Sequence, residues 1–444
     1  MLFVLLALFP RIDSFEYTNP CAAPPRTDDT TLFSELINLL NYSLNYKVDP
    51  CEDFYQFACG NWIAAHANTT LLNWEEISPY QEMYYRFVKE QSKALISKEK
   101  SKSGAITQAR NFYHSCVQAE KHWRLLEVSG IDYVMGKVKR FGVFPMLSEG
   151  PFDEAHFNKK FDFTWLLAYF NQNKTVLHII APRIFHNYNM DQAIISFHPS
   201  KSLFSFLGQY FTQNLQRIFT EFLLRLMKLI AADTGVNYNN TNVQPDILAL
   251  RTFMEKLHSI AVPNMAYIVT DDKSLEKSNA SRLSEVDGTT YKVNWTEYFF
   301  LVTPPIAHSY ILQDPVVAVP SDEYVEKVNQ VLDETSPRTL TNYVMVQYIL
   351  SWLPLLEDKY RELIEWFSAK LDHNFPQNRS KICYAETSKH YSVAMLAMYA
   401  RSRSTKALRP LAEGMVRGII DGLKDQIKEN KWMSEAFKKV CTLL

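Results

Sequence analysis

Two cysteines, Cys51 and Cys59, lie eight residues apart in the segment whose local structure the sequence specifies most strongly. Asp49 is a residue type that caps helices, Pro50 suits the first helical position, and Glu52 completes a capping box. The pattern predicts a helix from Pro50. Because a helix rises ~1.5 Å per residue, it would place the two cysteines ~12 Å apart, too far for a disulfide between them. The apolar residues on one side of this helix are Phe54, Phe57, Ala58 and Trp62.

Helical periodicity extends along most of the chain, and glycine is scarce, with 12 in 444 residues. Ser336, followed by Pro337, marks one further helix start, whereas Arg409 and Pro410 interrupt the last helical stretch. The sequence therefore predicts a mainly α architecture with a few short strands. The further helical segments are 32–44, 203–230, 247–260, 336–371 and 392–429, and the strand candidates are 176–180, 267–270 and 316–319.

The charge balance argues against one class of partner. The chain carries 47 Lys and Arg residues against 48 Asp and Glu residues, a net charge of −1. Binding to nucleic acid or to anionic lipid relies on a positive field, which this chain lacks overall. We therefore predict no nucleic-acid partner and favour peptides, or a secreted or membrane protein.

The first residues have the composition of a targeting segment. Residues 2–9 form an unbroken apolar run, followed by Pro10, Arg11 and Asp13. Eight residues are too few to span a bilayer as a helix, but they match the apolar core of a signal peptide. We predict a signal peptide over residues 1–14, or alternatively a short signal anchor, and a leader with the first helix over residues 15–48.

Seven Asn-x-Ser/Thr sequons are spread over the whole length of the chain. Such sequons accept N-glycans in the secretory pathway. Together with the apolar start, they predict a secreted, extracellular glycoprotein, or one on the extracellular face of the plasma membrane. The acceptor residues are Asn41, Asn68, Asn173, Asn239, Asn279, Asn294 and Asn378.

Four motifs follow one another in an order typical of a known family. They are DPCEDFYQFACGNW from Asp49 to Trp62, NFYHSC ending at Cys116, VNWTEYF around Trp295, and LTNY from Leu340 to Tyr343. With these motifs, the sequence resembles the N-terminal, non-catalytic domain of the neprilysin and endothelin-converting-enzyme family of zinc metallopeptidases. The resemblance extends over roughly residues 45–440, and it implies a domain of this type over residues 49–444.

In the family that this chain resembles, the zinc ligands lie further along the sequence. They include two histidines four residues apart in His-Glu-x-x-His, which places both imidazoles on one face of a helix. No two of the eleven histidines in this chain are four residues apart, and no Glu-Asn-x-x-Asp is present. We therefore predict no catalytic residue, no metal ligand and no cofactor in this chain; zinc, and the catalytic zinc domain, would belong to the full-length family.

The resemblance also implies a peptide groove that is altered here. The family usually has an arginine at the position of Asn73, where it helps to hold the C-terminal carboxylate of a peptide, and an acidic residue at the position of Ser78. Asparagine cannot offer the charged, bidentate fork that arginine presents to a carboxylate. We expect altered peptide binding.

The family resemblance further implies a disulfide between Cys116 and Cys383. This bond would close a loop of about 267 residues and stabilise the fold by roughly 5 kcal/mol in the chain-entropy description. In the family, the partners of Cys51 and Cys59 lie in the catalytic half. Within this chain, Cys21 and Cys441 remain as substitutes, and free thiols are the alternative.

Three functions are consistent with the sequence. The first is a family homologue that ends before the catalytic domain, is inactive by itself, and acts as a secreted peptide- or protein-binding glycoprotein, a pseudoenzyme. A second is a fragment of an active zinc metalloendopeptidase that processes extracellular peptides. The third is a subunit that completes a catalytic half in trans, with Cys51 and Cys59 in interchain bonds.

Overall fold

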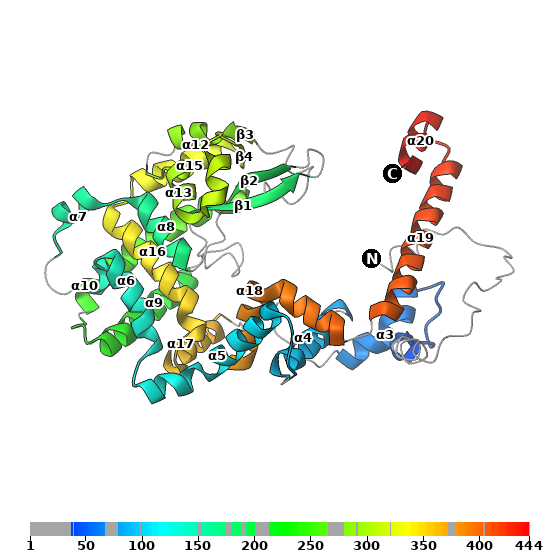
Figure 1. The fold of residues 1–444 in the computed structure, drawn as a ribbon, viewed down its shortest axis with the longest axis horizontal. Helices are drawn as coiled ribbons and strands as arrows, with labels where there is room; N and C mark the ends of the chain where they lie inside the picture. The colour runs from blue at the N-terminus through cyan, green and yellow to red at the C-terminus, as the bar shows by residue number, and fades with distance from the viewer. Residues whose placement is uncertain are drawn as a thin grey trace. The chain divides into compact units, whose positions relative to one another are not determined.

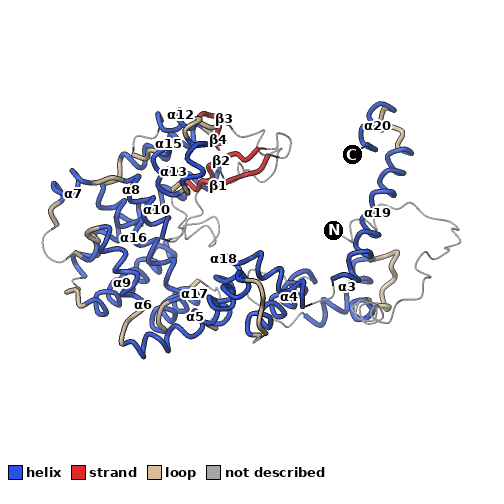
Figure 2. The backbone as a smooth tube through the Cα atoms, viewed as in Figure 1, coloured by secondary structure: helices blue, strands red, loops and turns tan. Residues whose placement is uncertain are grey.

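The structure is a computed structural model. It describes residues 37–38, 40–66, 79–97, 99–148, 152–173, 179–187, 192–199, 213–238, 240–264, 279–289, 292–319, 321–371, 378–402 and 405–443. The described chain is mainly helical, as the sequence predicted, and its strands gather in one small sheet (Figure 2). It divides into two compact units: unit 1 contains residues 1–71, 75–99 and 393–444, and unit 2 contains residues 72–74 and 100–392.

Unit 1 contains the segment with Cys51 and Cys59, and here the predicted helix start is wrong. Helix α3 begins at Phe54, not at Pro50, because the carboxylate of Asp53 accepts the N–H of Gln56 and caps the helix. The Asp49 carboxylate instead accepts the N–H of Cys51, within a turn that precedes the helix. The helices of this unit are α3 (Phe54–His66), α4 (Pro79–Ile96), the end of α18 (Arg379–Ser402), α19 (Thr405–Glu429) and α20 (Glu435–Leu443).

The glycine in α3 is explained by the chain that packs on it. The N–H of Asn45 donates to the carbonyl of Phe57, and the Nδ2 of Asn61 donates to the carbonyl of Leu44. A Cβ added at Gly60 would lie only 3.1 Å from the Asn45 side chain. Glycine at this position therefore lets the preceding segment lie against the helix.

Unit 2 contains the large apolar core, which draws its residues from Ile131 to Phe367. Helix α16 (Pro337–Trp352) crosses this core, and every residue from Thr339 to Ile349 is buried (Figure 1). As predicted, Ser336 caps α16 by accepting the N–H of Thr339. The other helices of this unit are α5 (Gly104–Leu126), α6 (Gly130–Phe141), α7 (Glu154–Lys160), α8 (Phe163–Asn173), α9 (Gln213–Thr234), α10 (Asn240–Asn264), α12 (Leu283–Thr289), α13 (Trp295–Val302), α14 (Pro305–Ile311), α15 (Asp322–Asp333), α17 (Asp358–Ala369) and the first part of α18, with 3-10 turns at Pro145–Leu147 and Leu353–Leu355.

The sheet of unit 2 has the strand order β1-β2-β4-β3. The hairpin of β1 (Ile180–Asn187) and β2 (Gln192–Pro199) is antiparallel, β2 pairs in parallel with β4 (Val316–Val319), and β3 (Asn279–Arg282) pairs antiparallel with β4. Strand β4 is the one predicted at 316–319. The candidate at 176–180 overlaps β1 only at Ile180, and the candidate at 267–270 lies outside the described residues.

Two predicted helical stretches are divided in the structure. The stretch 336–371 becomes α16 and α17, which are separated by the 3-10 turn at Leu353–Leu355. The stretch 392–429 is divided between α18 and α19, and Pro410 lies inside α19 rather than at the break. Helix α18 is kinked at Tyr391, whose φ of −127° and ψ of 31° are not helical. Of 203–230, the described part lies in α9.

Candidate functional site

A disulfide between Cys116 and Cys383 joins α5 to α18 within unit 2, and it is the pair that the family resemblance implied. The two Cα atoms are 5.7 Å apart, and the sequence separation is 267 residues. Cys383 is fully buried. The bond therefore fastens the beginning of this unit to its end.

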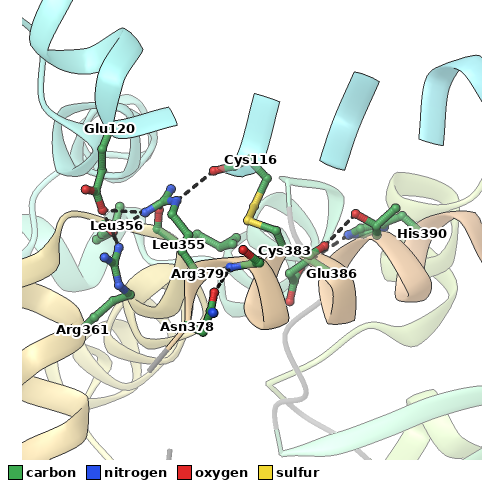
Figure 3. Close-up of a disulfide and its surroundings, with 12 residues drawn as sticks. Cys116, Glu120, Leu355, Leu356, Arg361, Asn378, Arg379, Cys383, Glu386 and His390 are labelled. Atoms are coloured by element: carbon green, nitrogen blue, oxygen red, sulfur yellow. Dashed lines mark hydrogen bonds and ion pairs between the residues drawn. A yellow bond between two sulfur atoms is a disulfide. The ribbon is translucent and has the colours of Figure 1, made fainter. Parts of the chain in front are cut away.

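Two arginines and one glutamate form a cluster beside this bond, as Figure 3 shows. Glu120 lies one turn after Cys116, and its Oε1 accepts hydrogen bonds from Arg361 at 2.5 Å and from Arg379 at 2.8 Å. The Nε of Arg379 donates to the carbonyl of Cys116 at 2.8 Å, and its remaining nitrogens donate to the carbonyls of Leu355 and Leu356. Each arginine is thus held by several acceptors.

The electrostatics of this cluster are those of a structural clamp. Burial lowers the pKa of Arg379 from its ordinary value, while the Glu120 carboxylate opposes that shift. Arginine stays protonated in folded proteins, so the cluster keeps its positive charges at physiological pH. The cysteine sulfurs are bonded to each other and offer no thiolate nucleophile. The cluster holds α5, α17 and α18 together rather than reacting with a substrate.

A Ser–His pair that no sequence pattern indicated lies on β2. The Oγ of Ser196 lies 2.7 Å from the Nε2 of His198, and both side chains are buried, His198 to 2% exposure. A nucleophilic serine must meet its substrate, and this pair has no such access. Burial, with a smaller contribution from the positive charge of Arg183, lowers the pKa of His198 to about 4. The imidazole is therefore neutral at neutral pH.

The buried histidine predicts a pH-dependent stability. In the unfolded chain His198 takes up a proton near pH 6.5, whereas in the folded chain it does so only near pH 4. As far as His198 is concerned, the folded state therefore has its full stability above pH 6.5. This stability is lost progressively as the pH falls towards 4, because the unfolded chain then binds a proton that the folded chain does not. The loss amounts to about 3 kcal/mol. Urea unfolding measured between pH 7.5 and 4.5 should show this decline.

The matched comparison for this prediction is between two histidines. His198→Gln should flatten the decline, whereas His156→Gln, which changes an exposed histidine, should retain the wild-type decline. An equal pH dependence in all three proteins would show that His198 does not control it.

A small cavity lies in the core of unit 2, between described residues. Its volume is about 20 Å³, which is room for a water molecule and not for a peptide. Within the described part of the chain, no group of three or more His, Cys, Asp or Glu side chains is placed to hold a metal ion. The residues that line the cavity include Phe163, Asn171, Trp295, Tyr298 and Asn329.

Three of the predicted glycan acceptors have described side chains, and all three are exposed: Asn41, Asn294 and Asn378. Asn294 caps α13, since its Oδ1 accepts the N–H of Glu297. The Oδ1 of Asn378 accepts the N–H of Ser380 at the start of α18. In both, the acceptor role falls on Oδ1, so Nδ2, the atom to which a glycan attaches, is not used by the cap.

The remaining predicted site residues are placed only in part. Cys51 is exposed and Cys59 is half-buried, and neither is in a disulfide. Burial raises the pKa of the Cys59 thiol. Asn173, Asn279 and Cys441 lie in α8, β3 and α20, and their side chains are not described. The residues outside the described ranges are Cys21, Asn68, Asn73, Ser78 and Asn239.

Comparison with known proteins identifies one family. The family model described as Peptidase family M13 matches residues 50–442. Neprilysin-1 of Caenorhabditis elegans is 23% identical over 427 residues, which cover 93% of this chain and 54% of that protein. Human endothelin-converting enzyme-like 1 is 22% identical over 454 residues, with coverages of 97% and 54%. The chain thus spans about half the length of these curated relatives.

Solved structures share the fold. The zinc metalloprotease ZMP1 of Mycobacterium tuberculosis, solved with an inhibitor, superposes with a TM-score of 0.63 at 12% identity, covering 90% of this chain and 57% of that one. PepO of Lactobacillus rhamnosis superposes with a TM-score of 0.61 at 13% identity, covering 88% and 58%. Separately, none of the helices in the described ranges is long and apolar enough to cross a membrane.

Proposed function

Because the chain belongs to peptidase family M13, we propose that by itself it is a non-catalytic relative of the family's zinc metallopeptidases that binds peptides or proteins. One contrast carries the proposal. The family match extends over residues 50–442, yet none of the eleven histidines stands in a His-Glu-x-x-His motif. Zinc-dependent hydrolysis requires a metal that polarises the carbonyl and acidifies water, whereas binding requires only a complementary surface.

The proposed setting is outside the cell, in a secreted glycoprotein. The apolar residues 2–9 and the seven sequons support it. The exposure of Asn41, Asn294 and Asn378 is compatible with glycans at these residues. Treatment of protein secreted from eukaryotic cells with an N-glycosidase should therefore reduce its mass.

The test of the proposal is a metal and peptidase assay on the secreted chain. We expect zinc at well below one ion per chain, and no chelator-sensitive cleavage of a quenched fluorescent peptide. C. elegans Neprilysin-1, prepared in the same way, serves as the positive control. Stoichiometric zinc together with chelator-sensitive cleavage by the chain would overturn the proposal.

Binding is tested by competition in the same assay. An excess of the chain that sequesters the peptide should slow cleavage by C. elegans Neprilysin-1, and more peptide should restore the rate. Since Asn73 stands where the family usually has an arginine, we propose that binding does not rely on the C-terminal carboxylate of the peptide. A peptide with a free C-terminus and the same peptide with an amidated C-terminus should then compete equally with the fluorescent peptide for binding to the chain. An unchanged cleavage rate at any excess would argue against peptide binding.

A second candidate function is a part of an active zinc metalloendopeptidase, with the zinc-binding residues supplied by further polypeptide or by another chain. The observation that favours it is the exposed apolar face of α19 and α20 in unit 1. Cys51 and Cys59, which carry no disulfide, would then be available for bonds to that polypeptide. Non-reducing electrophoresis should show a covalent species larger than the chain; a monomer alone would contradict the interchain bonds.

A further inference from the structure

Helix α19 has three glycines on one face. Gly414, Gly418 and Gly422 follow one another at intervals of four residues, which places them along one side of a helix. A Cβ added to any of them would meet nothing within 4 Å. Glycine is a poor helix former, and within the described chain no neighbour requires its small size here. A close-packed neighbour that approaches this face would require it.

An apolar stripe runs beside the glycines. Its five side chains recur at positions i, i+1, i+4, i+5 and i+8, and between 43% and 55% of each is exposed. A solvent-facing helix side would carry polar residues, as another side of α19 does with Arg417 and Lys424. The stripe is therefore a packing surface without its partner in the described chain. Its members are Met415, Val416, Ile419, Ile420 and Leu423.

Helix α20 enlarges this surface. It contacts α19, and its Phe437 and Val440, which lie one helical turn apart, are 52% and 57% exposed. The family match extends to residue 442 and so includes both helices. The apolar surface thus belongs to the part of the chain that is shared with the longer relatives.

We propose that the face of α19 formed by the glycines and the apolar stripe is the docking surface for a helix of M13 sequence that lies beyond the part matched here. The proposal rests on the second candidate function above. Two observations select this occupant. The match covers 54% of C. elegans Neprilysin-1, so nearly half of that polypeptide lies outside the match. The combination of a glycine row with flanking large apolar side chains suits a closely approaching apolar helix.

Site-specific photo-crosslinking in cells of the source organism tests the occupant. A photoreactive amino acid replaces Ile419 on the apolar stripe or, as the matched control, Lys424 on the polar side. We expect the probe at 419 to capture a peptide from M13 sequence beyond the part matched here, in the same or another chain, and the probe at 424 to capture at least tenfold less. Capture of a second copy of residues 1–444, of lipid or of an unrelated protein, or no protein capture at 419, would overturn the proposal.

A pair of variants tests the close approach. Gly418→Leu adds a bulky side chain to the glycine row, whereas Lys424→Leu adds the same side chain to the polar side of the helix. We expect Gly418→Leu to reduce the recovered M13 polypeptide at least tenfold and Lys424→Leu to leave it unchanged. Circular dichroism should show equal helix content in both variants. Equal recovery would contradict the close approach.

The zinc and peptidase assay on the same material separates the two proposals. Capture of M13 sequence at 419 without hydrolysis would leave the docking surface standing and remove the peptidase function. Hydrolysis without capture of M13 sequence at 419 would support the peptidase function and remove the docking surface.

Discussion

Replacing Cys116 and Cys383 together by alanine is expected to lower the free energy of unfolding by about 5 kcal/mol. The bond closes a loop with a sequence separation of 267 residues, so its loss greatly enlarges the conformational freedom of the unfolded chain. Equilibrium urea unfolding of wild type and double variant measures the effect. A reductant should shift the midpoint of the wild type towards that of the double variant, and it should leave the double variant unchanged.

Cys51→Ser is the matched control for this prediction. Cys51 is exposed and carries no disulfide, so its replacement should change the free energy of unfolding by no more than about 0.5 kcal/mol. If the double alanine variant unfolded at the same urea concentration as the wild type, the disulfide would not stabilise the fold by restricting the unfolded chain.

The arginine cluster should keep α5 and α18 in contact in the folded chain when the disulfide is removed. Arg379 holds the carbonyl of Cys116 and the carboxylate of Glu120 without involving either sulfur. We therefore interpret the disulfide and this cluster as two separate connections between α5 and α18. The sulfurs restrict the unfolded chain, whereas the arginine orients the folded helices.

The helical content could be predicted because it depends on local patterns. Ser336 and Pro337 start α16 as expected, since a cap needs only a side-chain oxygen and a free N–H two or three residues later. The start of α3 shows the limit of such reasoning. Both Asp49 and Asp53 are capping residues, and the turn formed at Asp49 leaves Asp53 to accept the first helical N–H.

The sheet was harder to predict because its strands do not share one pattern. Strand β4 is a continuous apolar run, and its Val317, Ala318 and Val319 are buried. Strand β2 buries Ser196 and His198 as well as its apolar residues. Polar residues on the buried side remove the signal that a hydrophobicity pattern provides. The Ser–His pair was missed for the same reason.

The pairing of Cys116 with Cys383 came from family resemblance, and spacing alone would not have selected it. The docking face of α19 illustrates a different limit. Its apolar residues predict a helix with one packed side, but the sequence does not tell whether that side is covered. Only the exposure of Ile419 and its neighbours in the structure shows that the described chain leaves it open.

An ion pair between α10 and α16 lies outside any sequence pattern, because Asp246 and Arg338 are 92 residues apart. The Nε and Nη2 of Arg338 each lie 2.7 Å from a carboxylate oxygen of Asp246, and Nη2 also donates to the carbonyl of Pro145. The guanidinium lies 4.5 Å from the ring centre of Phe152. Bonding to Asp246 raises the pKa of Arg338 above its ordinary value. The carboxylate side chain is only 9% exposed, so it depends on the arginine for its charge balance.

Arg338→Met should therefore lower the free energy of unfolding by about 3 kcal/mol, because it leaves a buried carboxylate without its partner. Adding Asp246→Leu should restore most of that loss, since two apolar side chains of similar size can replace a buried pair at little cost. Lys327→Met is the matched control, because it breaks an exposed ion pair. The side chains of Lys327 and Glu323 are 53% and 75% exposed, so the loss of this pair should lower the free energy of unfolding by no more than about 0.5 kcal/mol. Urea unfolding of the wild type and all four variants, including Asp246→Leu alone, completes a double-mutant cycle. Strict additivity of the two single changes would mean that the pair does not act as one unit, and α10 and α16 would then be joined by their apolar contacts alone.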